Sequence, residues 1–460
     1  PVETSDTVTV LEKIGHFLDE ENQLLYTQGK KLGLSKKEIT NHIIKTINIQ
    51  SILNESAKKW DGGYVIGGLL GHGDAFIMRD PNGIRPAFYY IDDEVVVAAS
   101  ERPVIQTAFN LSEKDVIELE PGHSLIIKKD ASVEIERFIE PKPKKACSFE
   151  RIYFSRGTDK DIYQERKKLG VLLTPNILKE IDYDIRNTVF SYIPNTASVA
   201  FQGMMDQVHS FSSDMIKEKI LKNKDNISAE MLDVFFSNKP RVESIAVKDV
   251  KLRTFITQDN QRDDLVGHVY DVTYGVVRKG VDTLVVLDDS IVRGTTLKQS
   301  IIQILDRLHP KKIVIASSAP QIRYPDCYGI DMARLSDFVA FNAAIELLKD
   351  TKQDHIINEL YNKSKAQQNL PKEEIINYVK EIYEPFKAAQ ISNKVAELVK
   401  TKGIKAEVKV IYQSIEDLHK AIPNHTGDWY FTGNYPTPGG NKVVNQSFIN
   451  YIEGINTRAY

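Results

Sequence analysis

The segment from residue 283 to 297 constrains the fold of this chain more than any other. It opens with four apolar residues, Leu284 to Leu287, which predict a short buried strand. Two adjacent carboxylates, Asp288 and Asp289, follow at its carboxyl end, and a turn of small residues leads on into a helix. Open α/β sheets bind their ligands outside the carboxyl ends of the strands. The segment therefore predicts a ligand site where a strand gives way to a helix.

The residues after this turn predict a helix and then a second strand. Apolar residues recur at helical spacing and form one stripe: Leu297, Ile301, Ile304, Leu305 and Leu308. His309-Pro310 ends the helix, and residues 312–316 supply the next strand. A strand, a helix and a strand make a βαβ unit, which implies a parallel sheet with a right-handed crossover.

The turn itself has the chemistry of a phosphate site. Ser290, Thr295 and Thr296 offer hydroxyls. Arg293 offers a guanidinium, and Gly294 lets the backbone approach a ligand closely. Two carboxylates beside such a cradle would repel a bare polyanion, but they suit sugar hydroxyls or a bridging Mg²⁺. The predicted ligand is a phosphorylated sugar with a metal-bound group, and the alternative of a plain solvated turn does not explain the ordered strand, turn and helix.

The string from Asp288 to Thr296, Asp-Asp-Ser-Ile-Val-Arg-Gly-Thr-Thr, resembles the binding motif for phosphoribosyl pyrophosphate (PRPP) of type I phosphoribosyltransferases. In full it is similar to that of the amidophosphoribosyltransferase family. Stretches in both halves of the chain resemble the same family: residues 79–86, 99–101, 248 with 253–256, 318–332 and 431–437. The resemblance implies an enzyme that forms phosphoribosylamine from PRPP and glutamine-derived ammonia, with release of pyrophosphate, in the first step of purine synthesis.

The resemblance also implies the domain organisation. Residues 1–145 would be a partial glutamine amidotransferase domain of the N-terminal-nucleophile type, with antiparallel sheets and helices. Residues 146–350 would be a type I phosphoribosyltransferase domain, with a parallel sheet and helices. Residues 351–460 would form a helical C-terminal extension and tail. The expected fold class is thus α/β together with α+β.

Local patterns predict the remaining elements. A first helix would bury one stripe of apolar residues: Val10, Leu11, Ile14, Phe17 and Leu18. Gly and Pro turns separate strand-like segments at 64–70, 75–78, 87–90, 95–99 and 124–127, as in an antiparallel sheet. Helices are expected at 372–383 and 391–400. Segments 205–243 and 351–402 are interpreted as surface elaborations or oligomer contacts without chemistry.

The resemblance assigns roles to single residues. Asp288 and Asp289 would bind the ribose hydroxyls and Mg²⁺. The 5′-phosphate would be held by the residues of the turn: Ser290, Ile291, Val292, Arg293, Gly294, Thr295 and Thr296. Thr196, in Ile-Pro-Asn-Thr, resembles a second family loop and would serve the metal and pyrophosphate, unless it is an ordinary turn after a strand at 189–192.

The segment that carries Lys248 and Arg253 resembles a family loop that covers pyrophosphate. Lys248 and Arg253 would close over the leaving group, because both are suited to phosphate. The alternative is a charged loop that is only solvated. Segment 205–243, which precedes Lys248, is longer and richer in lysine than the corresponding family segment.

The amino end departs from the family pattern. Family members begin with a cysteine whose thiolate attacks glutamine while its α-amine acts as base. This chain begins with Pro1, and Cys147 and Cys327 lie too far along the sequence to substitute. Thr4-Ser5-Asp6 resembles a family tripeptide, so Asp6 is either a ligand of the glutamine α-amino group or a helix N-cap. We expect a fragment of a longer protein rather than a glutaminase-dead form, and no glutaminase activity from this chain.

Some family members carry an iron–sulfur cluster on four cysteines. Cys147 matches one ligand position and Cys327 is one residue displaced from another, whereas Gly427 and Tyr430 stand at the remaining two. One matching thiolate cannot hold a cluster that needs four ligands. The expected cofactor is Mg²⁺, with no iron–sulfur cluster.

Composition limits the kinds of partner and compartment that are expected for this protein. The net charge of −3 over 460 residues gives no basic surface for nucleic acid, and no apolar run is long enough to span a membrane. Two cysteines fit a reducing compartment, so a cytoplasmic protein is expected. The resemblance implies purine nucleotides as feedback inhibitors and a homo-oligomer, either dimer or tetramer. Two other functions stay open: a PRPP-binding regulatory protein without transferase activity, and a base-salvage phosphoribosyltransferase.

Overall fold

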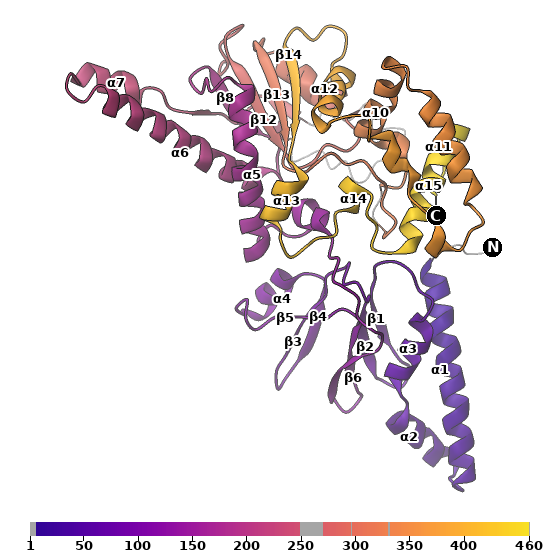
Figure 1. The fold of residues 1–460 in the computed structure, drawn as a ribbon. Coiled ribbons are helices and arrows are strands. Elements are labelled where there is room, and N and C mark those ends of the chain that lie inside the picture. Colours follow the sequence, from indigo (N-terminus) through magenta and orange to yellow (C-terminus); the bar gives the residue numbers. More distant parts are fainter. Residues whose placement is uncertain (1–5, 249–269, 296, 330–331, 460) are drawn as a thin grey trace. The chain divides into compact units, whose positions relative to one another are not determined.

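The fold is described from a computed structural model of the chain. The structure describes residues 6–248, 270–295, 297–329 and 332–459. The chain divides into two compact units, Pro1–Cys147 and Ser148–Tyr460, each with sheets of its own (Figure 1). Among the described residues, no helix has the length and apolar character needed to cross a membrane.

The first unit contains two antiparallel sheets. The larger has the strand order β1-β2-β6-β7 and the smaller the order β4-β3-β5. The strands are β1 (Val65–Leu69), β2 (Ala75–Arg79), β3 (Phe88–Ile91), β4 (Val96–Ala99), β5 (Ile117–Glu118), β6 (His123–Ile127) and β7 (Val133–Arg137). The antiparallel sheets predicted for this part of the chain are confirmed.

Four helices accompany these sheets: α1 (Asp6–Lys31), α2 (Lys36–Thr46), α3 (Ile49–Ala57) and α4 (Arg102–Phe109). Helix α2 packs chiefly on α1, whereas α3 and α4 contact strands. Ile14 of α1 is buried, and Val10, Phe17 and Leu18 pack against the same apolar cluster. The prediction that Leu11 joins this stripe is wrong, since its side chain is 70% exposed. Leu11 lies beside the buried stripe rather than within it, because Val10, Ile14, Phe17 and Leu18 are the residues of this part of α1 that contact the cluster.

The second unit is built on a five-stranded parallel sheet with the order β14-β13-β12-β8-β9. Its strands are β8 (Thr188–Tyr192), β9 (Arg241–Val242), β12 (Thr283–Asp288), β13 (Lys312–Ser317) and β14 (Glu407–Tyr412). Leu284 to Leu287 in the central strand are 0% exposed. This explains the unbroken apolar run, because helices cover both faces of a parallel sheet. The predicted parallel sheet is confirmed.

The predicted helix between β12 and β13 also forms. It runs through η4 (Leu297–Ile301) into α9 (Ile302–Asp306). Every residue of the predicted stripe is buried, from Leu297 to Leu308. The chain then reverses at His309, which has a positive φ of 55°, and enters β13. The βαβ unit is therefore confirmed.

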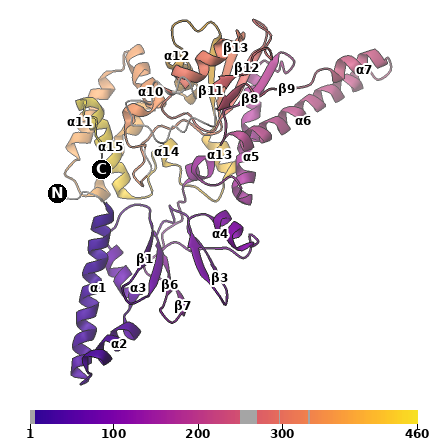
Figure 2. The same ribbon diagram turned by 180° about the vertical axis from the view of Figure 1, so that it is seen from behind.

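Helices α5 (Lys160–Glu180) and α6 (Ser198–Lys222) cover one face of this sheet, while α10 (Val339–Asp350) and α12 (Ala388–Val399) lie at the other (Figure 1). The carboxyl half of α6 and α7 (Ala229–Phe236) extend away from the sheet in both views (Figure 2). Helix α7 buries none of its residues. Segment 205–243 is thus largely exposed helix, which fits either a surface elaboration or an oligomer contact.

The carboxyl-terminal region contributes to the sheet as well as to its helical cover. Strand β14 pairs along its whole length with β13, so the parallel sheet extends beyond the boundary expected at residue 350. The helices that follow α10 include α11 (His355–Ala366), α13 (Ile415–Ala421), α14 (Trp429–Thr432) and α15 (Pro438–Glu453). The helix predicted at 391–400 corresponds to α12.

The helix predicted at 372–383 is wrong. The segment forms two separate short turns, η6 (Lys372–Glu374) and η7 (Tyr378–Ile382). Between them the backbone of Ile376 bonds to side chains rather than to its own helix: its N–H donates to Gln367 Oε1 at 3.0 Å, and its carbonyl accepts from Asn445 at 2.7 Å. The local sequence pattern that predicted a helix did not reveal these partners.

Candidate active site

The acidic pair lies at the carboxyl edge of the parallel sheet. Asp288 is the last residue of β12, and Asp289 begins the turn. The backbone N–H of Ser318 donates to the Asp288 carbonyl at 2.9 Å, and that of Ala319 donates to the Asp289 carbonyl at 3.0 Å. Ile193, after β8, donates to Leu287 at 2.8 Å. The loops that follow β8 and β13 therefore fix the pair on either side.

The two carboxylates share a site that is short of positive charge. Burial and repulsion from Asp289 raise the pKa of Asp288 well above its usual range. Burial raises the pKa of Asp289 to about 6, although hydrogen bonds from Ser290 and Thr196 and the charge of Arg166 act in the opposite direction. Ser290 Oγ donates to Asp289 Oδ1 at 3.0 Å. A bound cation would relieve the cost of ionising both groups.

The bend after the pair keeps backbone donors available. In the part of the chain that the structure describes, the N–H groups from Ile291 to Gly294 donate to no other protein group. The carbonyls hold the bend instead: Val292 accepts from the N–H of Val339 at 2.9 Å, and Gly294 accepts from that of Lys298 at 2.9 Å. Free N–H groups at the start of a helix form a cradle for an anion.

Gly294 is required by the geometry of this bend. Its φ is +69°, in the left-handed region that L side chains rarely adopt. A Cβ here would lie 3.0 Å from Val339 Cγ2 and 3.3 Å from Val399 Cγ1, so α10 and α12 press directly against the turn. Glycine meets both demands because it has no side chain.

The other side chains of the bend differ in how far they are exposed to solvent. Arg293 is 40% exposed, and its Nη2 lies 3.5 Å from Asp337 Oδ2. Ile291 is buried, so its share in a phosphate site would be its backbone N–H. Thr295 is exposed at the start of the helix, whereas Thr296 lies outside the described residues.

Three residues from other elements reach the acidic pair. Thr196, predicted from the loop after β8, hydrogen-bonds to the Asp289 carboxylate. Arg166 on α5 and Tyr153 on η1 (Glu150–Phe154) were not predicted. The charge of Arg166 lowers the pKa of Asp289, and burial together with both aspartates raises the pKa of Tyr153. These three residues lie on separate segments of the sequence, which come together only in the folded structure.

Arg166 is held in place by backbone carbonyls. Its Nε donates to the carbonyl of Arg151 at 2.8 Å and its Nη2 to that of Ser155 at 2.6 Å. The side chain is 5% exposed. Arg166 is a charged residue on the same helix face as the apolar Leu169, and this position was the signal in the sequence that could have identified Arg166 as a site residue.

The remaining predicted site residues fall elsewhere. Lys248 ends the short strand β10 (Ala246–Lys248), which pairs with β11 (Tyr270–Val272). Arg253 lies outside the described residues. Asp6 is an exposed residue in the first turn of α1 in the first unit, where a carboxylate suits the positive end of a helix. Their roles in ligand binding stay predictions.

The residues at the acidic pair fit Mg²⁺ that arrives with a ligand. Among the described residues, no three or more His, Cys, Asp or Glu side chains are grouped so as to hold a metal ion by themselves. Asp288, Asp289 and Thr196 offer carboxylate and hydroxyl oxygens. Protein-bound Mg²⁺ is usually held by one or two carboxylates and completed by substrate phosphates and water. The arrangement suits a metal shared with a phosphorylated substrate.

The absence of an iron–sulfur cluster stays a prediction. Both cysteines are free thiols, Cys147 buried and Cys327 partly exposed. In the second unit, the N–H and Oγ of Ser148 donate to the carbonyl of Gly427 at 2.8 and 2.9 Å. Tyr430, at the other substituted position, donates its hydroxyl to Asp326 at 2.7 Å. Gly427 and Tyr430, at the two positions that the resemblance assigns to cluster ligands, thus both take part in hydrogen bonds.

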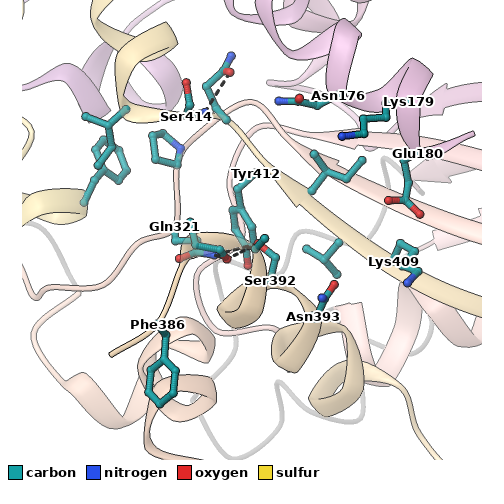
Figure 3. Close-up of a pocket in the computed structure, with 18 of the residues that line it drawn as sticks. Asn176, Lys179, Glu180, Gln321, Phe386, Ser392, Asn393, Lys409, Tyr412 and Ser414 are labelled. Atoms are coloured by element: carbon teal, nitrogen blue, oxygen red, sulfur yellow. Dashed lines mark hydrogen bonds between the residues drawn. The ribbon is translucent and has the colours of Figure 1, made fainter. Parts of the chain in front are cut away.

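A polar cavity of about 810 Å³ lies along β14 (Figure 3). Asn176 and Lys179 of α5 line it on one side and Ser392 of α12 on the other, with Tyr412 between them. The pKa of Tyr412 is raised by burial and by the charge of Asp288, and among the described residues its buried hydroxyl has no hydrogen-bond partner. Asp288 itself does not line the cavity. The cavity is therefore separate from the acidic site, although Tyr412 is close enough to sense the charge of Asp288.

The raised pKa values predict a pH-dependent stability. The carboxyl of Asp289 has a pKa near 3.8 when unfolded and about 6 when folded, so it takes up a proton on folding. Its contribution to stability is fully present below pH 3.8 and is lost as the pH rises through 6. We expect Asp289→Asn to become progressively more stable than the wild type across this range. Thermal unfolding from pH 4 to 8 measures the difference, and a difference independent of pH would contradict the assignment.

In the first unit, the segment at 79–86 forms a buried turn. The Asp80 carboxylate accepts hydrogen bonds from the backbone N–H groups of Asn82 and Ile84, each at 3.0 Å. Arg79 is 1% exposed and donates to the carbonyls of Arg85 at 2.8 Å and Gly83 at 3.2 Å. The segment that resembles a glutaminase motif thus stabilises its own backbone.

The sequence is similar to those of known amidophosphoribosyltransferases. The chain is 27% identical over 338 residues to the amidophosphoribosyltransferase of Lachancea kluyveri, an alignment that covers 70% of this chain and 58% of that protein. It is 28% identical over 291 residues to the amidophosphoribosyltransferase of Escherichia coli, covering 61% of this chain and 50% of that protein. The chain is a distant homologue of the amidophosphoribosyltransferases. It spans between half and three fifths of the length of these relatives. No family model matches the chain.

The fold of the amidophosphoribosyltransferases is also present. The glutamine PRPP amidotransferase from B. subtilis, solved in complex with ADP and GMP, superposes with a TM-score of 0.54 and 22% identity over 90% of this chain and 74% of that one. A structure described as the allosteric regulatory enzyme of purine biosynthesis gives the same TM-score of 0.54 over 91% of this chain. The likeness is one of fold: antiparallel sheets followed by a five-stranded parallel sheet.

Proposed function

We propose that this protein is an amidophosphoribosyltransferase whose second unit transfers the phosphoribosyl group of PRPP to ammonia. The observation that carries the proposal is the acidic pair Asp288 and Asp289, placed beside a bend with free N–H groups at the carboxyl edge of β12. In the reaction the ammonia nitrogen bonds to the anomeric carbon of the ribose, and the bond from that carbon to pyrophosphate breaks. A proton leaves the nitrogen, and the products are phosphoribosylamine and pyrophosphate.

The proposed roles follow the position of each group. The bend from Ser290 to Thr295 binds the 5′-phosphate through its N–H groups and hydroxyls. Asp288 and Asp289 would bind the ribose hydroxyls and, together with Thr196, would hold Mg²⁺. Bound Mg²⁺ supplies positive charge to the departing pyrophosphate. The donors are in place before the substrate arrives, so catalysis would consist of positioning and charge stabilisation.

Arg166 would act through Asp289. Its buried guanidinium favours the ionised form of that carboxylate, which is the form that accepts hydroxyls and cations. Lys248 and Arg253 are proposed to contact the pyrophosphate, as the family resemblance implies. The B. subtilis relative holds ADP and GMP, so purine nucleotides are the proposed feedback ligands and a homo-oligomer the proposed assembly.

An assay of pyrophosphate release tests the proposal. The protein is incubated with PRPP and Mg²⁺, first with ammonia and then with each purine or pyrimidine base in turn. We expect release with ammonia and none above background with bases. Release with a base alone would show a salvage transferase. PRPP binding without release under any condition would show a regulatory protein.

A further inference from the structure

A second group of charged residues gathers at the opposite edge of the parallel sheet. The amino ends of β8, β9 and β12 lie together there, and Asp288 is at the far end of β12 (Figure 2). A cavity of about 340 Å³ at this edge is lined by four cations and one hydroxyl: Arg186, Ser237, Lys239, Arg241 and Arg278. We call this the basic pocket. It shares no residue with the acidic site.

A buried carboxylate fixes two of these cations. Asp282, just before β12, has a side chain that is 0% exposed. It accepts from Arg278 Nε at 3.0 Å and Nη2 at 2.6 Å, and it lies 2.8 Å from Arg241 Nη1. Further bonds complete the arrangement: Arg278 Nη2 donates to the carbonyl of Arg186 at 3.0 Å, and Arg241 Nη2 to that of Val276 at 2.8 Å. Both guanidinium groups are thereby held in place.

The pocket keeps an excess of positive charge. Asp282 can balance one of the four cations, and no carboxylate belongs to the lining. Among the described residues, the side chains of Arg186 and Lys239 make no hydrogen bond or ion pair. Arg278 is 48% exposed and Arg241 29%, although Nη1 of Arg241 is itself buried beside Asp282. Four like charges brought together in this way repel one another unless an anion joins them.

We propose that the basic pocket binds a ligand through a chain of phosphate groups. Guanidinium groups match phosphate oxygens through paired hydrogen bonds, and a lysine adds a mobile point charge. Three arginines and a lysine around one cavity favour a ligand with several negative charges over a single carboxylate. The phosphate chain can belong to a nucleoside polyphosphate or to an inorganic polyphosphate, which share this chemistry. The site goes beyond the proposed transferase reaction and does not depend on it.

Calorimetric titration with inorganic triphosphate tests the site. EDTA is included, because without a divalent cation the paired carboxylates of the acidic site disfavour a polyanion. The wild type should bind triphosphate, and Arg186→Gln/Lys239→Gln should bind it at least about tenfold more weakly, since each removed cation takes charge-assisted hydrogen bonds with it. Asp289→Asn should bind as the wild type does, which separates this site from the transferase site. Adenosine triphosphate, titrated in parallel, shows whether a nucleoside adds affinity to the phosphate chain.

A matched double substitution controls for net charge. Lys217→Gln/Lys224→Gln removes two exposed cations from α6 and the loop after it, and it should leave triphosphate binding unchanged. The side chains of Arg186 and Lys239 have no described partners, so the test variant should melt at the wild-type temperature. No binding by the wild type, equal binding by Arg186→Gln/Lys239→Gln, or an equal loss in the control would each overturn the proposal.

Discussion

Asp289→Asn should lower ammonia-dependent pyrophosphate release by about 10²–10³-fold, and Asp288→Asn by a similar factor. An amide keeps the shape of the side chain but loses the charge that holds Mg²⁺ and orients the ribose hydroxyls. The loss cannot be attributed to unfolding, because removing one of two repelling carboxylates should stabilise the protein above pH 6. Initial rates with saturating PRPP, Mg²⁺ and ammonia, together with melting temperatures, measure both effects.

A distant aspartate provides the control. Asp214 is an exposed residue of α6, so Asp214→Asn should keep both the wild-type rate and the wild-type melting temperature. Wild-type rates in Asp288→Asn and Asp289→Asn would contradict the role given to the pair. A lower melting temperature at pH 7 would contradict the account of its electrostatics.

Gly170→Ala should destabilise the second unit by about 3 kcal/mol or more. Helices α5 and α6 approach so closely that a Cβ at Gly170 would lie 1.8 Å from the carbonyl oxygen of Ala200, and one at Gly203 would lie 1.8 Å from that of Lys167. Backbone atoms cannot move aside as a flexible side chain can, so the helices must separate. Urea unfolding of the full chain measures the loss.

The same substitution should impair the active site. Helix α5 carries Arg166, and α6 begins directly after the Thr196 loop, so separation of the helices moves both away from Asp289. Gly15→Ala in α1 is the control, because nothing lies within 4 Å of the added Cβ. Alanine also favours a helix over glycine by up to about 1 kcal/mol, so this variant should be as stable as the wild type or more so. Equal stability of Gly170→Ala and the wild type would refute the close approach.

The centre of the parallel sheet could be predicted because its signals are local. The apolar run before Asp288 and the helical stripe from Leu297 to Leu308 each depend on a few adjacent residues, and both formed as expected. Together they place the acidic pair at the carboxyl edge of the sheet. Gly294 was expected only to let the backbone approach a ligand, and its positive φ of 69° gives the bend a second reason to require glycine.

What the sequence did not reveal depends on contacts between distant segments. Arg166 and Tyr153 approach Asp289 only because α5 and η1 pack beside β12. Strand β14 joins the sheet from residues 407–412, beyond the expected domain end, since pairing is not encoded in a local pattern. The turns at 372–383 follow side-chain hydrogen bonds from far along the chain rather than helical spacing.

Net charge was equally uninformative about the basic pocket. The chain carries −3 overall, which argued against an extended basic surface. The cations of the pocket come from three separate segments that lead into β8, β9 and β12. No continuous run of basic residues in the sequence therefore indicates the pocket. Local charge at a protein surface depends on which loops the fold brings together.

The binding of PRPP, measured by calorimetry with and without Mg²⁺, tests whether the acidic pair and its bend form the substrate site. We expect saturable binding by the wild type that requires Mg²⁺ and is lost in the double variant Asp288→Asn/Asp289→Asn. Equally tight binding in EDTA, or unchanged binding by that double variant, would contradict the assignment of the acidic pair and its bend as the site for a magnesium-bound phosphoribosyl donor.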